Sequence, residues 1–426
     1  MHKQFLFGFL LLLLFTATGL CQQDTLTLNK CIDIALNNNP QIKLAEGNYD
    51  FAASNVTLAR SVLFPQVSFQ AGYVKNGGTT FIGPTSRTAY YENYSLTFQA
   101  QQLIFDFGKS TSRISAAADL RDASHQDYLS AKQDLILAAE IDYFNYLQAK
   151  RVRDASAEVV KQAQEHLYQA QAFYKAGTVA QFDVLKAQTD LANAKVNLIS
   201  SENNVRISKL QLENVLSQKL SNTVVMIDNL EATQDSIDIN TAMNIALNNR
   251  PEIISGKLKV EANKSYLTSA WAANLPSINA TGGYNKRSYG LVDEYFLPSW
   301  NIGATLSIPI FQGFALNAGI DQARANLKIS ESFDDNLIQN VALEVQQQYS
   351  SLQETRESIE ATRALVTQSE ETLKLAEGRY KQGVGSAVEI TDARVGLYNA
   401  RTSYIQSLYS YQVAYVGLKH AIGILK

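Results

Sequence analysis

Two stretches decide the fold: YKAGTVAQFDVLKAQTDLANAK at 174–195 and YKQGVGSAVEITDARVGLYNAR at 380–401. They begin 206 residues apart in the chain and are identical at seven positions. In each stretch a glycine, Gly177 or Gly383, follows a long helical pattern. Glycine supplies the positive φ that commonly ends a helix. Each stretch therefore predicts the bend of a helical hairpin, and the chain has two of them.

A helix returns from each bend. An acid, Asp183 or Glu389, opens the returning pattern, where it suits the positive end of the helix dipole. Small and apolar residues then recur at alternating steps of three and four, over 184–215 and again over 390–421. This heptad spacing predicts left-handed supercoiling of packed helices.

The helices before the bends are long. Between Gly108 and Gly177 lie 68 residues without glycine or proline, which predicts a helix of about 100 Å. The second copy has 58 such residues between Gly319 and Gly378. The chain has only seven prolines, and none follows Pro309. Tracts free of proline favour uninterrupted helices.

The repeat covers most of the chain. CIDIALNNNPQI at 31–42 matches AMNIALNNRPEI at 242–253, an offset of 211 residues. We expect two structural copies, at about 24–235 and 236–426, within one protomer of residues 22–426. A period above 200 residues is too long for a solenoid unit and indicates duplication of a half-structure.

The first 21 residues predict a secretory signal peptide. His2 and Lys3 precede an apolar run that ends at Phe15, and small residues follow. This run is too short to span a bilayer, which needs about 20 residues. Cleavage is expected after Cys21 or nearby. Lipidation of Cys21 is the alternative, although Leu20 fits that signal poorly. Cys31 is then the remaining cysteine and is expected to be a small buried apolar residue.

Four segments alternate with period two, and each presents one apolar, partly aromatic face and one small, polar, uncharged face. They are centred on residues 67–73, 93–100, 278–284 and 300–308. Strands of about 9–11 residues with this alternation suit a transmembrane β-barrel. We expect loops at 75–90 and 286–299. An ordinary half-buried sheet is the alternative.

Four strands do not close a barrel, and open strand edges are not tolerated in lipid. Single-chain barrels start at eight strands. If these strands enter a membrane, several chains must share one barrel: two chains supply eight strands, and three supply twelve.

The chain resembles the TolC-like outer-membrane efflux proteins over essentially its whole mature length. The likeness rests on the two tips, the duplicated segments, and the stretches LIFDFG at 103–108 and PIFQGF at 309–314. The resemblance implies a mainly α-helical homotrimer with a twelve-stranded β-barrel in the outer membrane and an α-helical tube through the periplasm. It also implies a periplasmic adaptor and an inner-membrane pump as partners. The function implied is the passive exit duct of a tripartite efflux or type I secretion system.

The resemblance also assigns roles at the tips. Glu389 and Asp392 lie one helical turn apart and match the acids that ring the pore entrance. Asp183 and Tyr380 match a latch between hairpins, but Gly385 occupies the place of the arginine expected there. Lys186, at the position equivalent to Asp392, is expected to pair with a neighbouring acid. The turns expected to meet the adaptor are Gly177, Thr178, Val179, Gly383, Val384 and Gly385.

Other classes have less support. The net charge of −3 implies no attraction to nucleic acid. Apart from His2, the histidines are His125, His166 and His420, far apart in the chain and without ligand spacing. We expect His125 and His166 to be solvated, and we expect no enzyme activity, metal site or cofactor. A periplasmic or surface coiled-coil protein without a pore is the alternative function, since it would share the heptads and the signal peptide.

Overall fold

The structure is a computed structural model that describes residues 25–82, 85–221, 225–231, 237–290 and 297–425. The expected signal peptide, with Cys21, lies outside these residues. The chain folds as two compact units. The described residues of the first unit are 25–39, 135–221, 225–231 and 349–417, and those of the second are 40–134, 237–290, 297–348 and 418–425.

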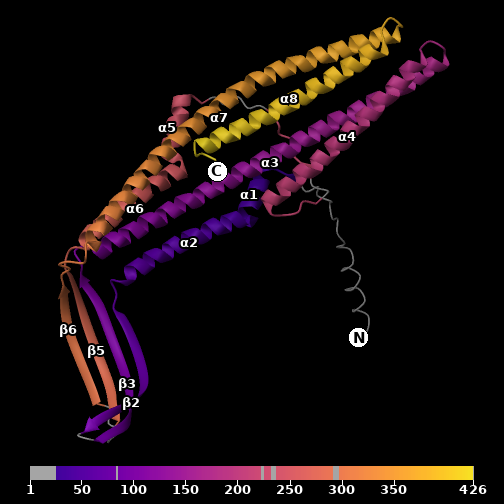
Figure 1. The fold of residues 1–426 in the computed structure, drawn as a ribbon. Helices are drawn as coiled ribbons and strands as arrows, with labels where there is room; N and C mark the ends of the chain where they lie inside the picture. The colour runs from indigo at the N-terminus through magenta and orange to yellow at the C-terminus, as the bar shows by residue number, and fades with distance from the viewer. Residues whose placement is uncertain (1–24, 83–84, 222–224, 232–236, 291–296, 426) are drawn as a thin grey trace, which may run out of the picture. The chain divides into compact units, whose positions relative to one another are not determined.

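One order of helices and strands occurs twice (Figure 1). The first series is α1 (Leu28–Asn38), α2 (Pro40–Ser61), β2 (Gln66–Ile82), β3 (Thr85–Phe105), α3 (Lys109–Lys175) and α4 (Gln181–Leu216). The second is α5 (Ile239–Asn249), α6 (Pro251–Ala272), β5 (Ser277–Gly290), β6 (Leu297–Ser307), α7 (Ala315–Lys381) and α8 (Ala387–Ala421). Two short strands, β1 (Thr25–Leu26) and β4 (Val225–Met226), pair in parallel.

The two long helices have equal length. The tract after Gly108 forms α3, with 67 residues, as predicted. The prediction for α7 was too short, because α7 also has 67 residues and runs through both Gly319 and Gly378. A glycine inside a helix costs only about 0.5–1 kcal/mol relative to alanine, so flanking helix formers and packing outweigh it.

In the second unit the four long strands form one antiparallel sheet in the order β2-β3-β5-β6 (Figure 1). The predicted loop at 75–90 is wrong, because β2 continues to Ile82 and β3 begins at Thr85. Gly77 lies within β2, and a Cβ there would lie 2.8 Å from the Tyr90 ring across the hairpin. Glycine here permits close approach of an aromatic side chain within a strand. The second expected loop, at 286–299, was predicted too long, because β5 continues to Gly290 and β6 begins at Leu297. Its middle, 291–296, lies outside the described residues.

The predicted heptad seams are buried in the first unit. On α4, a small residue recurs at every seventh position and is buried: Ala187, Ala194, Ser201 and Ser208. On α8, the buried seam residues in this unit are Ile390, Ala393, Leu397, Ala400, Ser407, Tyr411 and Ala414. Figure 1 shows each returning helix running back beside the long helix before it. Polar contacts join the same pairs, such as Thr362 with Ser407 at 3.0 Å.

Hydrogen bonds join α3 to the segment that follows β4 in the first unit. Tyr143 of α3 is fully buried and donates its hydroxyl to the carbonyl of Ile227, just after β4, at 2.6 Å. Arg151 holds Asp228 through two bonds of 2.7 and 2.8 Å. Cys31 of α1 is fully buried, as predicted, and burial raises the pKa of its thiol to about 12.

No helix within the described ranges combines the length and apolarity that crossing a lipid bilayer requires.

His166 is a correction to the sequence analysis. Its side chain is only 3 % exposed, so the prediction of a solvated position is wrong. The imidazole packs against the Tyr380 ring, with centroids 5.6 Å apart, and Tyr380 in turn contacts Phe173. Burial, followed by the nearby charge of Arg394, lowers the pKa of His166, although Asp190, Glu377 and Asp183 oppose the shift.

A lowered pKa predicts loss of stability in acid. The unfolded chain takes up the proton near the ordinary histidine pKa of about 6.5, before the folded chain does. The contribution of neutral His166 is therefore complete above that pH and is lost as the pH falls below it. We expect the thermal midpoint of the detergent-solubilised protein to fall less between pH 7.5 and 5.5 in His166→Phe than in wild type.

His125→Phe is the matched control, because His125 lies on the same helix and is exposed. If the two variants lose the same number of degrees as wild type over this pH range, His166 does not carry the pH dependence.

Candidate functional site at the hairpin tips

Both tips end in the same backbone turn. Gly177 has φ 76° and Gly383 has φ 75°, as the sequence predicted. At the first tip the amide of Gly177 donates to Tyr174 O at 2.9 Å and that of Thr178 to Phe173 O at 3.0 Å. This pair of bonds is a Schellman motif, which satisfies the last carbonyls of a helix.

The second tip repeats these bonds with one addition. Gly383 donates to Tyr380 O and Val384 to Arg379 O, both at 3.0 Å. Gly385 then donates to Arg379 O at 3.1 Å, and a Cβ on Gly385 would lie 2.9 Å from the Cβ of Arg379. Any larger residue at 385 would displace this turn, so the arginine expected there by resemblance does not fit this backbone.

An acid lies in the first turn of each returning helix, but only the first of them caps its helix through its side chain. Asp183 Oδ2 accepts from the amide of Ala180 at 3.3 Å, at the start of α4. At the start of α8, the amide of Glu389 donates to Ser386 Oγ at 3.2 Å. Both positions agree with the predicted first-turn acids.

Glu389 also makes an ion pair that the sequence analysis missed. Arg379 Nε lies 3.2 Å from Glu389 Oε2, and Arg379 Nη2 donates to Val384 O at 3.4 Å. The side chains of Arg379 and Glu389 are about half exposed, so water screens their attraction. The signal available in the sequence was an arginine and a glutamate placed symmetrically about the turn 382–386.

The structure brings the two predicted pore acids together. Glu389 and the exposed Asp392 line one surface groove of about 680 Å³ between α7 and α8. Arg379 lies in the same groove, with Ser369, Thr372, Leu375, Ala376, Ala393 and Gly396. The groove therefore holds two carboxylates and one guanidinium.

Lys186 pairs with an acid on its own helix. Lys186 Nζ lies 2.5 Å from Asp190 Oδ1, one turn further along α4. The other oxygen of Asp190 accepts from Thr391 Oγ1 at 2.7 Å. Asp190, which the sequence analysis did not single out, thus links the two returning helices of one chain.

Tyr380 does not bond Asp183 within one chain. Its ring is buried against His166 and Phe173, and its hydroxyl has no hydrogen-bond partner among the described residues. Burial and the nearby charge of Asp183 raise the pKa of Tyr380. The residues assigned to a latch are therefore neighbours in the first unit but are not joined by a hydrogen bond.

This chain is similar in sequence to known outer membrane proteins. The family model described as "Outer membrane efflux protein" matches residues 31–218 and 242–424. Outer membrane protein TolC of Escherichia coli (strain K12) is 23 % identical over 403 residues, which cover 91 % of this chain and 80 % of TolC. Nodulation protein T of Rhizobium leguminosarum bv. trifolii is 24 % identical, covering 93 % of this chain and 85 % of that protein.

Solved structures agree on the fold. The Campylobacter jejuni CmeC outer membrane channel superposes with a TM-score of 0.82 at 23 % identity, covering 93 % of this chain and 85 % of CmeC. CusC superposes with a TM-score of 0.84 at 21 % identity, covering 93 % of this chain and 92 % of CusC. Because the family model matches both halves of the chain, this protein belongs to the outer membrane efflux protein family.

Proposed function

We propose that this chain is the outer-membrane exit duct of a tripartite efflux or type I secretion system, a passive conduit for substrates driven by an inner-membrane pump. One observation carries the proposal beyond family membership. A sheet with a lipid-compatible face and two open edges is joined to helical hairpins whose tips carry acids. A coiled-coil protein without a pore, the alternative function, needs neither feature.

The sheet has the side-chain pattern of a barrel wall. The register aligns four aromatic residues, one from each strand, in a single row: Phe69, Phe98, Tyr284 and Trp300. All four are exposed. Rows on the opposite face are polar and uncharged, such as Ser68, Gln99, Gly283 and Asn301. Aromatic girdles on the lipid face and a polar interior are typical of transmembrane barrels.

The sheet also indicates assembly. β2 and β6 are its edge strands, and each has an unpaired side. Edges are not tolerated in lipid, so each edge must pair with another chain. We propose a homotrimer with a twelve-stranded barrel, in agreement with the family resemblance.

The helices of the first unit support self-association independently. Adding 206 to a residue number of α4 gives its counterpart in α8. Ile199 is 66 % exposed and its counterpart Ile405 only 9 %, while Leu210 is 58 % exposed and its counterpart Val416 only 2 %. On α8 this second seam lies on α3 of the same chain, where Tyr398 contacts Ser156 at 3.1 Å. The equivalent seam of α4 needs a long helix from another copy.

The second unit repeats this asymmetry on shorter helices. Leu44, Phe51 and Leu58 form an exposed stripe at heptad spacing on α2. Their counterparts on α6 are Ser255, Ala262 and Ser269, which are buried. Ser255 donates to Asp127 of α3 at 2.6 Å, and the residue of α7 that matches Asp127 is the exposed Phe333. By this repeat symmetry, Leu44 of one copy packs on Phe333 of another.

At the tips, the acids supply the gate of the duct. Three copies of Glu389 and Asp392 would place six carboxylates around the entrance, and rings of carboxylates favour cations. Arg379 offsets part of that charge and limits the repulsion that would widen the ring. We also propose that Asp183, Lys186 and Tyr380 take part in latching the hairpins, and that the turns 177–179 and 383–385 meet the periplasmic adaptor.

We further propose that residues 1–21 are a secretory signal peptide and that the mature chain spans from the outer membrane into the periplasm.

The duct and its gate are tested by conductance in planar bilayers. Wild type is expected to form a cation-selective pore. Glu389→Gln/Asp392→Asn should lower its cation selectivity severalfold, and Arg379→Gln should raise it. Glu371→Gln is the matched control, because Glu371 is an exposed acid of α7 that does not line the groove. A pore whose selectivity is equal in all four proteins contradicts the gate, whereas a wild type that forms no pore contradicts the duct.

The helical seam is tested by the thermal stability of the trimer. Burial of an isoleucine contributes about 1.5–3 kcal/mol, so a charge at Ile199 should weaken the contact between subunits. The barrel would still hold three copies together, so we expect Ile199→Asp to stay trimeric but to dissociate into monomers at a lower temperature than wild type, as read by electrophoresis of heated, detergent-solubilised protein. Lys195→Asp, at an exposed polar position of α4, should dissociate at the wild-type temperature. An Ile199→Asp trimer that dissociates at the wild-type temperature would show that this seam is not an interface.

Adaptor docking is tested at the turns. Gly177→Leu and Gly383→Leu place a side chain at positive φ, which costs roughly 1–2 kcal/mol and reshapes the turn. We expect normal amounts in the outer membrane but loss of efflux in cells. Gly378→Leu, inside α7 with open space around it, should retain efflux. Unchanged efflux in the two turn variants would refute the docking role.

A further inference from the structure

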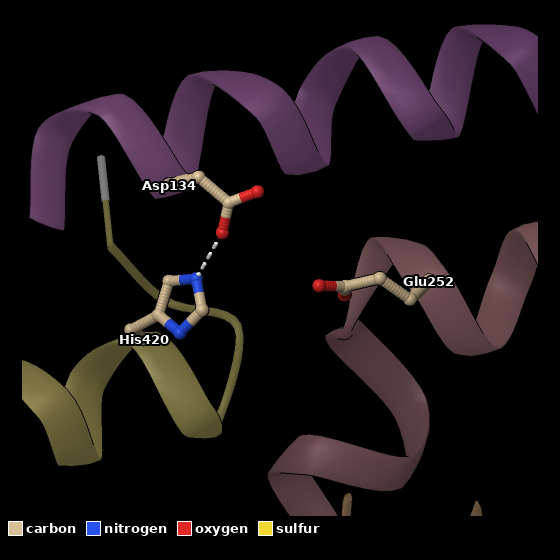
Figure 2. Close-up of side chains that lie close together, drawn as sticks. All are labelled: Asp134, Glu252 and His420. Carbon is tan, nitrogen blue, oxygen red and sulfur yellow. Dashed lines mark hydrogen bonds and ion pairs between the residues drawn. The ribbon is translucent and has the colours of Figure 1, made fainter. Parts of the chain in front are cut away.

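Three ionisable side chains from distant parts of the chain converge in the second unit. Asp134 comes from α3, Glu252 from the first turn of α6 and His420 from the last turn of α8. Their ligand atoms all lie within 4.8 Å of one another. Figure 2 shows the imidazole and both carboxylates pointing toward one another, with His420 Nε2 bonded to Asp134 Oδ1 at 2.8 Å. Sequence spacing gave no hint of this cluster.

Neighbouring groups hold these side chains in place. Ser130 donates to Glu252 Oε1 at 3.0 Å, and Arg250 Nε lies 3.2 Å from Glu252 Oε2. Glu344 Oε1 lies 3.7 Å from His420 Nδ1, on the opposite edge of the ring from Asp134. Glu344 also pairs with Arg250 Nη1 at 2.6 Å. A hydrogen bond to Asp134 therefore holds one edge of the His420 ring, and the Glu344 carboxylate faces the other edge at ion-pair distance.

The local charge favours a cation. Asp134, Glu252 and Glu344 carry three negative charges, against one positive charge on the buried Arg250. An imidazole ligates a metal ion in its neutral form, through a nitrogen that carries no proton.

The first repeat has neutral amide side chains at the positions that match this junction. Arg250, Glu252 and His420 correspond to Asn39, Gln41 and Asn214 in the first copy. Asn39 Nδ2 donates to Val215 O at 2.9 Å, and Arg250 Nη1 donates to the matching Ala421 O at 3.3 Å. A neutral amide makes this helix-end contact in the first copy, so the contact itself does not require the charge of Arg250.

We propose that His420 Nε2 and the carboxylates of Asp134 and Glu252 bind a divalent cation of the Zn²⁺ class. One imidazole with two carboxylates is a donor set that Zn²⁺ accepts, with water completing four ligands. The nitrogen donor disfavours Mg²⁺ and Ca²⁺, which prefer oxygen. Asp134 is well exposed and gives the ion a route in. Glu344 faces Nδ1 at 3.7 Å, on the side from which an outer-shell carboxylate orients a ligating histidine.

Such an ion would join α3, α6 and the end of α8. The bound ion would therefore stabilise the second unit. This proposal does not rest on the duct function, since Zn²⁺ binding is measured on detergent-solubilised protein without conductance or efflux.

The test is calorimetric titration of ZnCl2 into tag-free, EDTA-treated protein, in wild type, Glu252→Gln and His420→Gln. We expect one ion per chain in wild type, with a Kd in the micromolar range or tighter. Each variant loses a direct ligand and should bind at least tenfold to a hundredfold more weakly, since loss of an outer-shell partner alone costs that much. Glu252→Gln keeps an acceptor for Ser130, so it tests the site even if His420→Gln fails to fold. MgCl2 should give no comparable heat in wild type.

His125→Gln is the control, because it removes an exposed histidine of the same unit and should leave Zn²⁺ binding unchanged. The thermal midpoint of wild type should rise with Zn²⁺, and that of Glu252→Gln should not. Two results would overturn the proposal and leave an ion-pair network only. One is that wild type binds no Zn²⁺ at a concentration 100-fold above the expected Kd, and the other is that both variants bind Zn²⁺ as tightly as wild type does.

Discussion

The first unit depends on how closely helical backbones approach along the seams of α4 and α8. Small residues at every seventh position of α4 let it lie against α3. The matching positions of α8 are also small and buried, and larger apolar residues such as Leu397 and Tyr411 lie between them. A helix of 67 residues is too long for a globular core to surround it, so it needs another source of tertiary packing. A returning helix supplies that packing, and the glycine turns make the return possible. The long helix, the seam that packs on it and the turn that connects them therefore depend on one another.

Much of this constraint is visible in the sequence. The two glycines predicted positive φ, the absence of glycine and proline predicted α3, and the heptads predicted the buried face of α4. The errors have physical causes. Gly319 and Gly378 cost α7 too little to interrupt it, and Gly77 serves a neighbouring Tyr90 ring within a strand. His166 is polar by composition but buried, because tertiary packing and not local pattern decides what surrounds it.

The candidate site was predictable only in part for the same reason. Glu389 and Asp392 follow from their spacing on one helix, so their shared groove was expected. Arg379 and Asp190 were missed, because their partners come from across a turn or from another helix, and helical spacing carries no information about such pairs. The cluster of Asp134, Glu252 and His420 is the extreme case, since it joins three segments that only the complete topology of the second unit brings together.

Differences between the two repeats carry the functional information. Where the copies are alike, as at the glycine turns, the shared residues serve the backbone. Where they differ, one copy has a neighbour in its own chain and the other lacks it, as for Ile405 and Ile199. The second tip pairs its acid with Arg379, whereas the first pairs Lys186 with Asp190 along one helix. If both tips reach one entrance, as we propose, the acids of the second tip are the ones left facing a groove. The charge that a passing solute meets would then be set by the second copy of the repeat, while the first copy holds the neighbouring hairpins in place.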